Sequence, residues 1–125
     1  MNPKQQAFLL LFILIFSACC IYFYEEKLYP AYVSFYYSCH PPEVNVTKFI
    51  SERGFERAGE FDSNTENITL FLPDDSTIKH EVCHMEQQEY GRLYSCNQPI
   101  GKYLNEVECY FREDYMNYVN VSKYK

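Results

Sequence analysis

The feature that most constrains this chain is a run of residues without a charged side chain, from Ala7 to Tyr24, which ends at Glu25 and Glu26. Such a run is just long enough for a helix that crosses a bilayer. We therefore predict a signal anchor in residues 1–27, with its transmembrane helix at about residues 7–24. Lys4 before the run and the acidic flank after it favour an N-terminus in the cytoplasm.

Two other interpretations of this segment stay open. Residues Leu9–Phe16 fit the apolar part of a cleaved secretory signal. The residues that end at Cys19 resemble a bacterial lipobox, in which the cysteine carries a lipid. All three interpretations place the rest of the chain outside the cytoplasm. We expect a membrane-attached protein with an extracytoplasmic domain, and secretion after signal cleavage is the alternative.

Length and charge narrow the class of the exported part. A chain of 125 residues supports one small domain once its N-terminus is set aside. The formal net charge of −6 leaves no basic patch for phosphate groups. We therefore expect no nucleic-acid partner, while the oligomeric state stays unknown.

The pentapeptide HEVCH occupies residues 80–84, in a stretch that favours a helix. Because side chains four residues apart lie on one helix face, His80 and His84 can reach the same metal ion. Two imidazole nitrogens suit Zn²⁺, and Glu81 is placed to take a proton from a zinc-bound water without ligating the metal. The alternative is a polar helix turn that matches the motif by chance.

This pentapeptide resembles the H-E-x-x-H motif of zincin metallopeptidases, and a second motif is similar to that of their gluzincin branch. In that branch a glutamate on the next helix, often in the pattern N-E-x-x-Ala or N-E-x-x-Ser, is the third zinc ligand. Here the sequence NEVEC stands at residues 105–109, with Cys109 where a small residue is usual. The resemblance implies Glu106 as the third ligand. Glu108 is the competing carboxylate, and on a helix it points away from Glu106.

The resemblance implies a zinc-dependent peptidase. His80, His84 and Glu106 would hold Zn²⁺, and Glu81 would activate the water that attacks a peptide carbonyl. The expected partner is a peptide or protein substrate, whose cleavage site the sequence does not give. The alternative is an exported, non-catalytic domain with a zincin-like fold, which binds metal or is stabilised by disulfides.

The six cysteines have different expected roles in the two parts of the chain. Those of the N-terminal segment are Cys19 and Cys20. The others lie where an oxidising compartment favours disulfides: Cys39, Cys83, Cys96 and Cys109. Cys83 and Cys109 each follow an expected zinc ligand by three positions, so we hypothesise that they join the two ligand helices and leave Cys39 for Cys96. Other pairings and a thiolate zinc site remain alternatives.

The expected fold is α+β: an N-terminal transmembrane or signal helix, and then a small zincin-like domain at residues 43–119. A juxtamembrane segment at residues 28–42 precedes the domain, and a tail at residues 120–125 follows it. The domain is expected to contain a short helix, an antiparallel hairpin and two consecutive ligand-bearing helices. Their expected positions are Glu43–Arg53, Phe55–Phe61 with Asn67–Leu72, Ser76–Tyr90 stopped by Gly91, and Ile100 to about Asn117.

Side-chain roles within the two ligand helices follow from their patterns. Apolar spacing predicts core contacts for Ile78, Val82 and Met85 in the first helix and for Leu104, Val107 and Phe111 in the second. Gln87 is expected to face solvent. The oxyanion donor is not singled out among Tyr94, Tyr103, Tyr110 and Tyr115. Carboxylates that could orient the imidazoles are Glu108 and Asp114.

Overall fold

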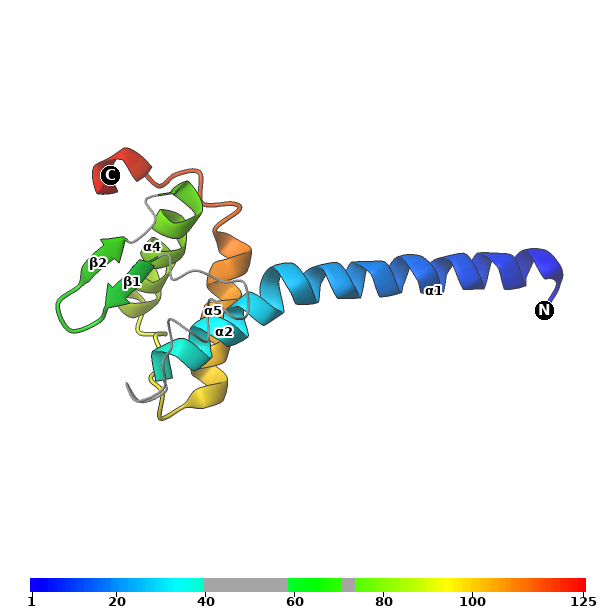
Figure 1. Ribbon diagram of the computed structural model, residues 1–125, viewed down its shortest axis with the longest axis horizontal. Helices are drawn as coiled ribbons and strands as arrows, with labels where there is room; N and C mark the ends of the chain where they lie inside the picture. Colours follow the sequence, from blue (N-terminus) through cyan, green and yellow to red (C-terminus); the bar gives the residue numbers. More distant parts are fainter. Residues whose placement is uncertain (40–58, 71–73) are drawn as a thin grey trace.

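A computed structural model describes residues 1–39, 59–70 and 74–125, and it shows a long N-terminal helix joined to a small domain of helices and a two-stranded sheet (Figure 1). The long helix α1 spans Pro3–Phe23 and begins with a capping box, in which Asn2 and Gln5 each accept the other's backbone N–H. None of its residues is buried. It is long and apolar enough to cross a membrane or to be a signal sequence.

The helical path continues beyond α1 into the domain. A π-helical segment, η1 at Tyr24–Leu28, leads directly into α2 at Tyr29–Cys39. Helix α2 packs against α5, and Ala31 and Val33 of α2 are buried. The described part of the expected juxtamembrane segment is therefore a helix that packs on the domain.

The sheet is a hairpin of β1 at Gly59–Asp62 and β2 at Asn67–Leu70, with Gly59 opposite Leu70 in the register. At the turn the Asp62 carboxylate accepts the N–H of Asn64 at 2.8 Å. Alternation in β2 directs Ile68 and Leu70 toward the core. Residues 55–58 and 71–72 of the expected strands, and the expected helix at Glu43–Arg53, lie outside the described residues.

Helix α4 spans Asp75–Glu89 and confirms the expected motif helix within one residue at each end. The Asp74 carboxylate caps it by accepting the N–H of Thr77 at 2.7 Å. Gly91 follows the helix with a φ of 68°, the left-handed conformation that glycine adopts most readily. Ile78 and Val82 are buried and Met85 packs against them, as expected.

Helix α5 spans Pro99–Arg112, so the prediction that it reaches Asn117 was wrong. The chain turns after Arg112 because the residues that follow return to the core. Met116, 1 % exposed, joins the cluster around Ile78, and the tail ends in a 3₁₀ turn, η2 at Val121–Tyr124, that also packs there. This return could not be read from helical spacing.

The prediction of an apolar core face on α5 was also wrong in part. Leu104 is 55 % exposed, whereas Asn105, Glu106 and Cys109 are the buried residues of this helix. A domain this small covers only one face of α5, and that face carries the polar ligand motif. Val107 and Phe111 are half-buried.

Two disulfides join these elements. Cys83–Cys109 connects α4 to α5, and Cys39–Cys96 connects the end of α2 to the segment between α4 and α5. Both pairings are those hypothesised from the sequence. They close loops of 26 and 57 residues. Loops of this length correspond to about 3–4 kcal/mol of stabilisation each, which is a large contribution in a small domain.

Candidate metal centre

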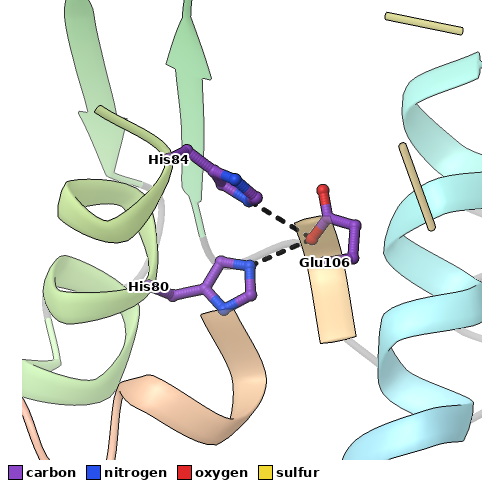
Figure 2. A group of neighbouring side chains, drawn as sticks. All are labelled: His80, His84 and Glu106. Atoms are coloured by element: carbon purple, nitrogen blue, oxygen red, sulfur yellow. Dashed lines mark hydrogen bonds and ion pairs between the residues drawn. The ribbon is translucent and has the colours of Figure 1, made fainter. Parts of the chain in front are cut away.

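The two histidines of the HEVCH motif point from adjacent turns of α4 toward one carboxylate on α5 (Figure 2). Oε2 of Glu106 lies 3.1 Å from Nε2 of His80 and 3.3 Å from Nε2 of His84. All three side chains are buried, and their donor atoms lie within 4.8 Å of one another. The cluster could hold a metal ion.

Both imidazoles are oriented by a second hydrogen bond through their other ring nitrogen. Nδ1 of His80 lies 3.0 Å from a carboxylate oxygen of Glu113, and Nδ1 of His84 lies 2.9 Å from the side-chain oxygen of Gln87. These contacts place the Nε2 atoms toward Glu106, which is the arrangement that metal-binding histidines usually show.

The sequence did not single out either orienting residue. Gln87 was expected in solvent but is fully buried, and it also donates to the backbone oxygen of Asn105 at 3.1 Å. Glu108 accepts instead from Gln87 and from Arg92, and Asp114 accepts from Lys27 at 2.5 Å. Of the two carboxylates named from the sequence, Glu108 therefore reaches an imidazole only through Gln87, and Asp114 pairs with Lys27. Glu113 was missed because the chain was expected to remain helical there.

The charges in the cluster are strongly coupled. Burial alone would lower the pKa of His80, but its hydrogen bonds with Glu106 and Glu113 raise that pKa to about 10. Burial likewise opposes the charge of Glu106, yet the two imidazoles hold its pKa well below the usual range of a glutamate. These opposite pKa shifts favour a protonated His80 beside an ionised Glu106.

Glu81 lies beside the cluster and is only 7 % exposed. Burial raises its pKa, and the neighbouring imidazoles act in the opposite direction. Within the described parts of the chain, no hydrogen bond or ion pair holds the Glu81 carboxylate. Strand β1 passes close by, since a Cβ added to Gly59 would lie 3.2 Å from Cγ of Glu81.

Among the candidate tyrosines, only Tyr110 packs against the cluster. Its ring centroid lies 4.3 Å from that of His80, and its hydroxyl lies 2.7 Å from the hydroxyl of Ser34 on α2. Burial raises the pKa of Tyr110, so the phenol stays protonated and can donate a hydrogen bond. The hydroxyl of Tyr103 donates to the backbone oxygen of Leu28 instead. Tyr94 and Tyr115 are exposed.

Two further residues of the NEVEC segment have clear roles. The Asn105 side chain accepts the N–H of Tyr94 at 2.8 Å and donates to the backbone oxygen of Arg92 at 3.0 Å. It thereby fixes the loop before α5. Cys109 forms a disulfide with Cys83, so this structure does not offer these sulfurs as thiolate ligands.

No protein-family model, curated protein or solved structure matches this chain. Any functional argument therefore starts from the cluster itself. The described residues combine a buried site that could hold a metal ion, two disulfides, and an N-terminal helix able to cross a membrane. Disulfides are typical of extracytoplasmic domains.

Proposed function

We propose that this protein is a small, membrane-anchored zinc peptidase whose domain lies outside the cytoplasm. The observation that carries the proposal is the approach of both Nε2 atoms to one oxygen of Glu106, at 3.1 and 3.3 Å. In a tetrahedral zinc site with bonds of 2.0–2.1 Å, neighbouring ligand atoms are about 3.3 Å apart. Each imidazole nitrogen already lies at about that distance from the carboxylate oxygen.

The chemistry of the donors fits zinc. Two imidazole nitrogens and one carboxylate oxygen form the ligand set of several zinc peptidases, in which a fourth position stays open for water or substrate. His80, His84 and Glu106 would hold the ion, and Glu113 and Gln87 would keep the rings in place. When bound, zinc would acidify a water molecule and polarise the substrate carbonyl.

Glu81 would act as the general base. It would accept a proton from the attacking water and pass that proton to the nitrogen of the leaving amine. Its burial favours this role, because a raised pKa brings the carboxylate closer to the pH at which it must bind and release a proton. The Tyr110 ring packs against that of His80, and its phenol is our candidate for stabilising the oxyanion.

The hairpin offers a place for the substrate. Gly59 brings the backbone of β1 against Glu81, so an extended peptide that paired with the hairpin would pass within reach of the base. In zincins a strand before the H-E-x-x-H helix binds substrate in this way, and the resemblance implies the same use here.

Substitution of the base separates an enzyme from a non-catalytic metal-binding domain. We expect the full chain with Glu81→Gln to retain stoichiometric zinc, by metal analysis, and the Tm of the parent protein. It should lose hydrolysis of a fluorogenic peptide library, because an amide cannot accept the proton. His84→Ala, the matched control, should lose zinc as well. Hydrolysis unchanged in Glu81→Gln would contradict the peptidase, and zinc binding without hydrolysis in the parent protein would favour the non-catalytic domain.

A further inference from the structure

We propose that the substrates are other membrane proteins, cleaved in the segment that lies about 15 Å above the hydrocarbon layer. The inference rests on the proposed function and on α1 as a membrane anchor. It follows from how the structure connects that anchor to the metal cluster.

The connection is a clamp, in which η1 and α2 contact α5, the helix that carries Glu106, and the segments on either side of α5. Near the start of the clamp, Nζ of Lys27 donates to the backbone oxygen of Tyr110 at 2.8 Å and pairs with Asp114. Further along, the backbone oxygen of Leu28 accepts the Tyr103 hydroxyl at 3.1 Å.

The clamp continues to the far end of α2. Ser34 meets the hydroxyl of Tyr110, and the disulfide Cys39–Cys96 fixes the last residue of the helix. Contacts with α5 and the segments beside it thus extend from η1 to the last residue of α2.

The path from anchor to clamp contains no flexible linker. Residues Pro3–Cys39 are helical throughout, as α1, η1 and α2 in succession. The ring of Phe23, at the end of α1, lies 6.0 Å from the ring of Phe111 on α5. Figure 1 shows the domain held at one end of α1 on this unbroken helical path. The domain therefore stands at a fixed height above the membrane.

That height can be estimated along the helix. The uncharged run ends at Tyr24, and Ser34 lies about ten residues further, which corresponds to about 15 Å at 1.5 Å per residue. Ser34 contacts Tyr110, whose ring lies 4.3 Å from the ring of His80. The metal cluster is thus one tyrosine side chain away from the level of Ser34.

A site held at this level selects substrates by the height of their cleavable segment above the membrane. Anchored neighbours share the bilayer with it, so their membrane-proximal segments reach it at a high effective concentration. Segments that a rigid stalk holds far above the membrane do not reach it.

The test uses the full chain in proteoliposomes with single-pass reporter substrates that carry one casein-derived segment. In one reporter the segment follows the membrane helix directly, and in the other a rigid helical spacer of about 30 residues raises it by about 45 Å. We expect the low reporter to be cleaved at least tenfold faster than the tall one. A flexible Gly-Ser insert of about 65 residues between Phe23 and Tyr24, with an r.m.s. length of about 45 Å, leaves the clamp in place, and it should restore cleavage of the tall reporter.

Each contrary result has its own meaning. Equal cleavage of both reporters by the parent protein, or cleavage of free casein alone, overturns the height selection and leaves the peptidase intact. No cleavage of any of these by the zinc-loaded protein overturns the peptidase, and the inference with it.

A second readout does not depend on activity. Because the chain contains no tryptophan, one introduced tryptophan reports its own energy transfer to dansyl-labelled lipid headgroups. Tyr115 follows Asp114, the residue that pairs with Lys27, and is 78 % exposed. Tyr90 follows the last residue of α4 and is 71 % exposed. Figure 1 shows α4 beyond α5 as seen from α1. Tyr115→Trp should transfer clearly more than Tyr90→Trp, and equal transfer would overturn the fixed height.

Discussion

The pH dependence of zinc binding tests the electrostatics of the cluster. With a pKa of about 10, His80 in the metal-free protein is neutral in about one molecule in 1,000 at pH 7. Zinc needs the neutral ring, so its binding must displace that proton. We expect the apparent zinc affinity at pH 7 to be about a thousandfold below its limiting value, a difference of about 4 kcal/mol.

The affinity should then rise about tenfold per pH unit between pH 7 and pH 9, with at least one proton released per zinc. Chelator competition at several pH values gives the slope. Calorimetry in two buffers of different ionisation enthalpy gives the proton count. The matched variant is Glu113→Gln, which keeps a hydrogen-bond acceptor but removes one of the charges that raise the pKa of His80. Its affinity should level off at a lower pH.

The same pKa has a consequence for the metal-free fold. The pKa of His80 is raised on folding from an ordinary value of 6.5 to about 10, so its protonation stabilises the folded chain. That contribution is complete below pH 6.5 and is lost as the pH rises through about 10.

A zinc affinity that stays constant between pH 7 and pH 9 would refute the coupling of His80 to Glu106 and Glu113.

Three further predictions concern single contacts. Replacing both Cys83 and Cys109 by alanine should cost about 3–4 kcal/mol of unfolding free energy, because the disulfide closes a loop of 26 residues; urea denaturation measures this, and a loss below about 1 kcal/mol would contradict it. Gln87→Leu removes the acceptor of the His84 Nδ1 proton and should weaken zinc binding about 10–100-fold in chelator competition. An unchanged affinity would show that Gln87 does not orient His84. Gly59→Ala should destabilise the fold by about 1–3 kcal/mol, since the new Cβ would meet a threonine methyl at 2.9 Å, and a Tm equal to that of the parent would contradict this packing.

The parts of the fold that follow from local chain geometry could be predicted from the sequence. Helical spacing put His80 and His84 on one face of α4, and it separated Glu106 from Glu108 on α5. The same spacing placed a cysteine beside each ligand face, and the disulfide pairing followed from the convergence of those faces.

The parts that depend on where a helix ends could not be predicted in this way. Glu113 reaches His80 because α5 stops at Arg112, and it stops there because Met116 returns to the core. No local pattern signals that return. The docking of α2 was missed for a related reason: its contact with Tyr110 through Ser34 joins residues 76 positions apart.

With α1 as the proposed membrane anchor, the unbroken helix from α1 to α2 would also fix the rotational orientation of the domain about the membrane normal. Each residue of a helix turns the chain by about 100°. The rotation of the domain about the helix axis is therefore fixed relative to each face of α1. A partner helix that packed on one side of α1 would always meet the same side of the domain. Deleting a single residue from η1 at Tyr24–Leu28 would turn the domain by about a quarter of a circle while the rest of each helix stayed intact.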